Sequence, residues 1–136
     1  MDLQILKIAA DNKYEKTLKK YTHQLKIKNS ICGDEINIRL MVKNNSINNL
    51  GYEINSCVYC QASISLMSKK VDKMNTYNAI TICEEMIKFF ESRNDKIPIK
   101  LKFFNKLLNK ENFSRKDCLL FPFKALKKVF KIDKKN

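Results

Sequence analysis

The 136-residue sequence has no apolar run that approaches the roughly 18 residues of a membrane-spanning helix. Its start, MDLQILKIAADNKYEK, lacks the basic region and apolar core of a secretion signal. Internal repeats, low-complexity blocks and a domain linker are also missing. We therefore expect a soluble, cytoplasmic protein without a membrane partner, built as one domain over residues 1–136 with a charged, mobile tail at 131–136.

Arginine is scarce, because Arg39, Arg93 and Arg115 are the only three among 27 basic residues. The net charge of +13 suits a phosphate partner, yet arginine is the side chain best suited to bidentate phosphate and base recognition. Asparagine and isoleucine are abundant too, a composition typical of an AT-rich genome. We interpret the charge as mainly a solvated surface and expect no nucleic-acid partner. Steering towards an acidic partner stays open.

Five cysteines, an odd number, occur without a secretion signal, so metal binding or thiol chemistry is favoured over disulfides. The single histidine, His23, lies in a polar stretch and is interpreted as a surface residue.

The pattern of apolar residues predicts an α+β fold. Residues 35–42 and 47–54 alternate as two strands of an antiparallel hairpin, with turn residues at 43–46. A third strand is expected but cannot be placed, and residues 22–30 read as a connection. Helices on one face of the sheet are predicted over residues 3–21, 61–70, 76–91, 99–108 and 117–130, with a loop at 109–116 and Pro122 close to the first turn of the last helix.

The hairpin brings distant cysteines together. Cys32 enters its first strand and Cys57 leaves its second, so the two thiols are expected to be neighbours. Cys57 and Cys118 each begin a predicted helix, where the helix dipole favours a thiolate. The thiols of Cys32, Cys57 and Cys118 and the carboxylate of Asp34 together form a donor set for tetrahedral zinc or a small iron–sulfur cluster. Asp34 also suits a turn cap. Whether Cys60 is a further ligand or a packed residue stays open, and Cys83 fits a helix core.

Three segments carry a family resemblance: NSICGDEINIRLMV, GYEINSCVYCQASISLM and SRKDCLLFPFKALKKVF, roughly residues 28–70 and 112–130. They resemble the iron–sulfur cluster assembly scaffolds of the NifU N-terminal (IscU/SufU) family. The resemblance implies a SufE/NifU-like α+β fold and makes Cys32, Asp34, Cys57 and Cys118 the site residues. It further implies a transient 2Fe-2S cluster or zinc, sulfur from a cysteine desulfurase, an iron donor, and apo iron–sulfur proteins as recipients.

The sequence departs from the family pattern at several positions. Ile54 and Ser56 replace glycines before the second site cysteine, Cys60 replaces a serine, and Asp117 replaces the histidine that precedes the third site cysteine in IscU-type members. Residues 109–116 contain no L-P-P-V-K motif, so a dedicated chaperone is not expected. The 61 positions from Cys57 to Cys118 are nearer the SufU-type spacing.

Three functions follow as hypotheses. The first is a scaffold, a carrier and not an enzyme, on which Cys32, Cys57 or Cys118 accepts sulfur before a cluster forms and moves to an apo-protein. The second is a zinc-containing sulfurtransferase of the SufU type. The third is a basic nucleic-acid-binding module in which zinc stabilises the fold.

Overall fold

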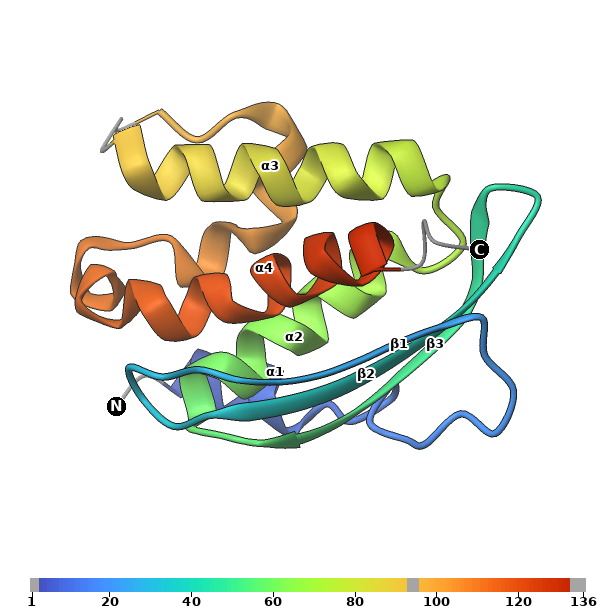
Figure 1. The fold of residues 1–136 in the computed structure, drawn as a ribbon. Coiled ribbons are helices and arrows are strands. Elements are labelled where there is room, and N and C mark those ends of the chain that lie inside the picture. The colour runs from blue at the N-terminus through green and yellow to red at the C-terminus, as the bar shows by residue number, and fades with distance from the viewer. Residues whose placement is uncertain (1–2, 93–95, 133–136) are drawn as a thin grey trace.

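The computed structural model describes residues 3–92 and 96–132. It confirms the α+β class, with a three-stranded antiparallel sheet covered on one face by helices (Figure 1). In chain order the elements are α1 (Leu3–Ala10), β1 (His23–Lys28), β2 (Glu35–Lys43), β3 (Ser46–Asn55), α2 (Val58–Val71), α3 (Thr76–Ser92), the 3-10 helices η1 (Ile99–Leu107) and η2 (Lys110–Arg115), and α4 (Lys116–Ile132).

The predicted hairpin is confirmed as β2 and β3. Its two-residue turn, Asn44 and Asn45, has positive φ at both positions, as a type I′ turn requires. The alternating apolar side chains form the inner face of the sheet, where Ile38 pairs with Tyr52 and Leu40 with Leu50, all of them buried. Because Glu35 pairs with Asn55, the segments on either side of these two residues meet at one end of the sheet.

The third strand lies in the stretch that we expected to be a connection. β1 pairs antiparallel with β2 from His23 opposite Leu40 to Lys28 opposite Glu35. Its pattern contains only two aliphatic side chains, Leu25 and Ile27, which are half-buried beneath α4. A short edge strand of this kind gives a weak alternation signal in the sequence.

The predicted helix over residues 3–21 is wrong beyond Ala10. The following segment, residues 11–22, crosses the outer face of the sheet from the edge of β3 to the edge of β1. The Tyr52 N–H donates to the Tyr14 carbonyl at 3.1 Å, and Arg39 donates to the Leu18 carbonyl at 2.8 Å. Leu18 is buried against the sheet, close to Gly51 of β3. Its burial therefore comes from packing on the sheet and not from a position on the apolar face of a helix.

The other helices occur where they were predicted, with small shifts. α2 and α4 pack against each other on the sheet, α2 against β3 and α4 against β1 and β2, and α3 packs on α4 (Figure 1). The buried stripe of α3 includes Cys83 and Met86 and leaves Ile80 and Ile87 half-buried. The short helix after Pro98 is 3-10 in type, and part of the expected 109–116 loop forms η2.

The last helix, α4, is longer than predicted. It begins at Lys116 and includes Lys131 and Ile132, which we had assigned to the mobile tail; residues 133–136 of that tail lie outside the described residues. Pro122 is the seventh residue of α4 and not in its first turn. Among residues 3–92 and 96–132, no helix is both long and apolar enough to cross a membrane.

Candidate metal centre

The turn between β1 and β2 positions Cys32 and Asp34. Asn29 closes this turn from both sides, because its N–H donates to the Asp34 carbonyl and its carbonyl accepts from Gly33 N–H, each at 2.7 Å. Gly33 has a φ of +77°, which an L-residue adopts only with strain. The turn therefore leaves the Cys32 side chain exposed and places Asp34, only 6% exposed, against the body of the protein.

Cys57 is the N-cap residue of α2 and lies beside Asp34. One carboxylate oxygen of Asp34 accepts the Cys57 N–H at 3.3 Å, and the other accepts the Cys57 thiol at 3.6 Å. The Asp34 side chain thus satisfies a backbone donor at the start of α2, which the Cys57 side chain does not do itself. The hairpin predicted Cys57 beside Cys32, and these contacts place Cys57 against Asp34, two residues after Cys32.

Cys118 enters the site from the first turn of α4, and its side chain is only 6% exposed. The buried hydroxyl of Ser63 on α2 donates to the Leu119 carbonyl at 2.6 Å, which ties this turn to α2. Pro122 has no N–H to donate to the carbonyl of Cys118, so this turn lacks one helical hydrogen bond. The bond from Ser63 therefore adds a tie to α2 in a turn that lacks one of its own backbone hydrogen bonds.

Three of these groups converge closely enough to share an ion. One ligand atom each from Cys32, Asp34 and Cys118 lies within 4.8 Å of the other two. Cys57 adjoins the group through its contact with Asp34. The arrangement therefore assembles three sulfurs and one carboxylate from three separate segments of the chain.

Two of the site thiols, Cys32 and Cys118, favour the protonated form in the apo-protein. Burial raises the pKa of Cys118 well above its ordinary value, and the neighbouring thiols of Cys57 and Cys32 raise it further. Partial desolvation also raises the pKa of Cys32, even though its side chain is exposed. A cation among these groups reverses this preference, because a coordinating thiol is deprotonated.

The remaining cysteines and the histidine lie outside this group. Cys60, one turn into α2, is fully buried in the core, and burial raises its pKa. Cys83 is fully buried on α3, as predicted, with its pKa raised by burial to about 12. His23 lies at the far end of β1, where its ring contacts Phe130 edge-on at 5.9 Å.

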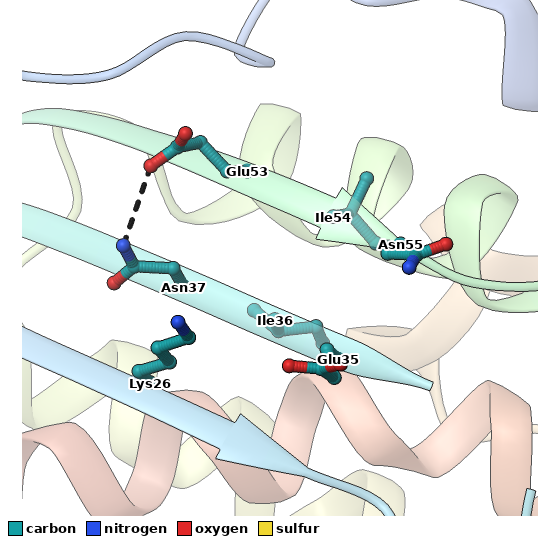
Figure 2. A pocket seen from close by; sticks show the side chains of 7 residues that line it. All are labelled: Lys26, Glu35, Ile36, Asn37, Glu53, Ile54 and Asn55. Atoms are coloured by element: carbon teal, nitrogen blue, oxygen red, sulfur yellow. Dashed lines mark hydrogen bonds between the residues drawn. The ribbon is translucent and has the colours of Figure 1, made fainter. Parts of the chain in front are cut away.

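Two features near the site were not predicted from the sequence. The Arg115 guanidinium lies over the Tyr59 ring at 5.2 Å, which links the start of α4 to the first turn of α2. The R-x-x-C spacing before Cys118 was the available signal for Arg115, while nothing in the sequence marked Tyr59 as its partner. The second feature is a hollow of about 240 Å³ on the outer face of the sheet (Figure 2), lined by Lys26, Glu35, Ile36, Asn37, Glu53, Ile54 and Asn55.

This hollow is lined mainly by polar side chains and includes none of the candidate site residues. Figure 2 shows Asn37 donating to Glu53 across β2 and β3, at 3.3 Å. Its relation to the site is only sequential, since Glu35 follows Asp34 and Asn55 precedes Cys57 by two residues.

Residues 5–98 match the sequence model of the NifU-like N-terminal domain. The chain belongs to this family. The iron–sulfur cluster assembly scaffold protein IscU of Thermotoga maritima is 30% identical over 105 residues, which cover 76% of this chain and 73% of that protein.

Solved structures of NifU-like proteins share the fold. The N-terminal NifU-like protein of Brucella abortus superimposes with a TM-score of 0.83 at 16% identity, covering 99% of this chain and 94% of the other. A protein of Fervidobacterium islandicum AW-1, described as an iron–sulfur cluster assembly scaffold for the SUF system, gives a TM-score of 0.80 at 18% identity, with 95% of each chain covered. These matches confirm the predicted family resemblance and the SufE/NifU-like fold class.

The NifU-like match includes Cys32, Asp34 and Cys57 but ends before Cys118. Cys118 is therefore associated with the site by its position in the fold, within 4.8 Å of the ligand atoms of Cys32 and Asp34.

Proposed function

We propose that this NifU-like protein assembles an iron–sulfur cluster on Cys32, Asp34, Cys57 and Cys118 and passes it to apo-proteins. The observation that carries the proposal is the convergence of Cys32, Asp34 and Cys118 ligand atoms within 4.8 Å, with the Cys57 thiol 3.6 Å from Asp34. Thiolates are the usual ligands of such clusters. The cluster is the cargo, and the protein is a carrier and not an enzyme.

Sulfur would arrive as the persulfide of a cysteine desulfurase. A scaffold thiolate attacks the terminal sulfur, the donor S–S bond breaks, and the donor cysteine leaves as a thiolate while the scaffold cysteine becomes the persulfide. Cys32 is the best placed of the site thiols to make this attack, because it is exposed on a turn while Cys118 is buried. An iron donor and apo iron–sulfur proteins complete the set of partners that we propose.

Asp34 suits a site that must release what it binds. A carboxylate is a harder ligand than a thiolate and binds iron in a sulfur-rich site less tightly. Its oxygens also accept hydrogen bonds from the Cys57 N–H and thiol. After the metal leaves, the Asp34 carboxylate therefore still has hydrogen-bond partners within the protein. The free thiols suit a reducing compartment, and we place the protein in the cytoplasm.

One observation favours a second candidate, a zinc-containing sulfurtransferase of the SufU type. Ligand atoms around one tetrahedral zinc ion lie about 3.8 Å apart, given a Zn–S distance of about 2.3 Å. The 4.8 Å span of Cys32, Asp34 and Cys118 is close to that spacing and is compact for ligands divided between two irons. Zinc held by these residues would keep the thiols deprotonated for sulfur transfer.

Anaerobic reconstitution separates these two candidates. The purified protein is incubated with ferrous iron and either inorganic sulfide or a cysteine desulfurase with cysteine, and metal content and visible absorbance are measured. We expect a chromophore with two irons and two sulfides per protein, lost in the Cys32→Ala, Cys57→Ala and Cys118→Ala variants. Cys83→Ala is the control, because that thiol is buried on α3 away from the site.

A protein that takes up one zinc, forms no chromophore and still accepts labelled sulfur would establish the sulfurtransferase instead. If the three site variants bound metal as well as Cys83→Ala does, neither function could reside at this centre.

A further inference from the structure

The outer face of α4 carries a stripe of lysines. Lys116, Lys124, Lys127, Lys128 and Lys131 recur at helical spacing, so they share one side of the helix. Lys127 is half-buried and pairs with Glu84 of α3 at 3.5 Å, while the other four are exposed. Within the described residues these four make no ion pair. We call these five residues the α4 lysine stripe.

Lysine is not spread evenly over the helices. The sequence of α4 contains five lysines and one acidic residue, Asp117, whereas the neighbouring α3 contains three glutamates and one lysine. A general lysine bias of the composition would have affected both helices. The charge on α4 is therefore a local feature.

The stripe is unfavourable for the isolated helix. Lys124 and Lys128, and likewise Lys127 and Lys131, are four residues apart, where like charges repel. Lys116 lies in the first turn, where the helix dipole disfavours a cation. An opposing surface that carries carboxylates would relieve both effects.

The stripe leads directly to the metal centre. Its first residue, Lys116, precedes Cys118 by two positions, and the guanidinium of the adjacent Arg115 lies over the Tyr59 ring at 5.2 Å, beside the start of α2. Arg115 is exposed, so its guanidinium N–H groups are accessible to a carboxylate of a partner. Figure 1 shows α4 uncovered along the front of the helical layer, between α3 and β1.

We propose that the α4 lysine stripe, with Arg115 at its site end, docks an acidic surface of the cysteine desulfurase that delivers sulfur to this centre. This inference rests on the proposed function. The partner is a protein surface rich in aspartate and glutamate beside its persulfide-carrying segment. Long-range attraction speeds the encounter, and Arg115 aligns the partner at the metal centre.

A folded protein fits this stripe better than a nucleic acid. The stripe presents lysines alone, which bind phosphate as point charges and read no sequence. It contains no aromatic side chain on which a base could stack. Glu84, Glu91 and Asp117 border it, and these carboxylates would repel a continuous phosphate backbone.

The test is a triple charge reversal, K124E/K128E/K131E, which leaves the first turn of α4 unchanged. The matched control is K19E/K20E/K43E, an equal change of charge at exposed residues of the crossing segment and the end of β2. Binding of the desulfurase from the same organism is measured by titration calorimetry at low salt and at about 1 M salt, where the Debye length falls to about 3 Å. Both variants are first loaded with iron and inorganic sulfide, a step that needs no partner.

We expect the stripe variant to bind the desulfurase about tenfold more weakly than the control variant at low salt, with the difference lost at high salt. Equal binding by the two variants would overturn the proposal. Wild-type binding of duplex DNA more tightly than of the desulfurase, abolished only in the stripe variant, would also overturn it. Failure of the unaltered protein to hold iron and sulfide would instead contradict the proposed function.

Discussion

Asp34 has two roles that a substitution can separate. Its carboxylate is a candidate ligand, and it also accepts the N–H of Cys57 at 3.3 Å. Alanine removes both roles, whereas asparagine keeps a neutral oxygen that can accept the same hydrogen bond.

The first prediction is that Asp34→Ala slows cluster release. Loss of the oxygen ligand leaves the cluster on thiolates alone, which hold iron more tightly. We expect transfer to an apo-ferredoxin to slow about tenfold, measured by visible circular dichroism as the acceptor spectrum appears. Asp34→Asn is the control for the hydrogen bond with Cys57. Release from Asp34→Ala at the wild-type rate would show that Asp34 only caps the turn.

Cys60 replaces a serine of the family pattern, and its fully buried position decides what that replacement does. A buried hydroxyl without a partner is costlier than a thiol. The second prediction is that Cys60→Ser keeps iron and zinc binding but lowers the free energy of unfolding by about 1–3 kcal/mol. Urea denaturation measures the loss, with Cys60→Ala as the apolar control. Loss of metal from both variants while the fold survives would make Cys60 a ligand.

At the scale of elements, the two stretches that sequence reasoning misjudged are neighbours. β1 has only Leu25 and Ile27 as aliphatic residues, and the crossing segment 11–22 has no period of its own. Their conformations depend on contacts with β2 and β3 that are far away in sequence. The hairpin and the helices α2, α3, η1 and α4 could be predicted, because the spacing of their apolar residues follows their burial.

The crossing segment explains Gly51. A Cβ at this position would lie 2.6 Å from the Lys16 carbonyl oxygen, so the segment can approach the sheet only over a glycine. The third prediction is that Gly51→Ala lowers the free energy of unfolding by about 2 kcal/mol, because backbone must move to relieve the contact. Urea denaturation of the apo-protein measures it.

Gly33→Ala is the matched control for this change. A Cβ there meets no atom within 4 Å, but the φ of +77° strains any L-residue. We expect the smaller loss of stability in Gly33→Ala but the larger loss of metal affinity, because Gly33 shapes the turn between Cys32 and Asp34. The reverse order for stability would mean that the crossing segment is free to shift.

At the scale of the whole molecule, the sequence could indicate the candidate site residues but not how closely they approach one another. The hairpin register predicts that Cys32 and Cys57 are neighbours. Cys118, however, reaches them only through the packing of α4 on α2, which includes the Ser63 bond to Leu119. The 4.8 Å span that favours a compact centre is likewise a result of tertiary packing, and no local pattern encodes it.

The buried thiols also make the stability of the whole molecule depend on pH. Burial raises the pKa of Cys83 to about 12, and it raises the pKa of Cys60 and Cys118 as well. In the unfolded chain a cysteine loses its proton near pH 8.5. Above that pH the unfolded state binds fewer protons than the native state, so stability must fall as pH rises.

The fourth prediction is therefore that the apo-protein loses stability between about pH 8.5 and 9.5, by about 1.4 kcal/mol per pH unit for each thiol that stays protonated. Urea denaturation in the presence of a phosphine reductant measures the slope. Cys83→Ala should reduce this slope by one thiol, even though it is less stable at pH 7. The stabilisation that bound zinc adds should change in the opposite direction. Because zinc binds deprotonated thiols, this added stabilisation should increase with pH over the same range. A pH-independent apo-protein, or zinc stabilisation that decreases with pH, would contradict the burial of these thiols and their part in the metal centre.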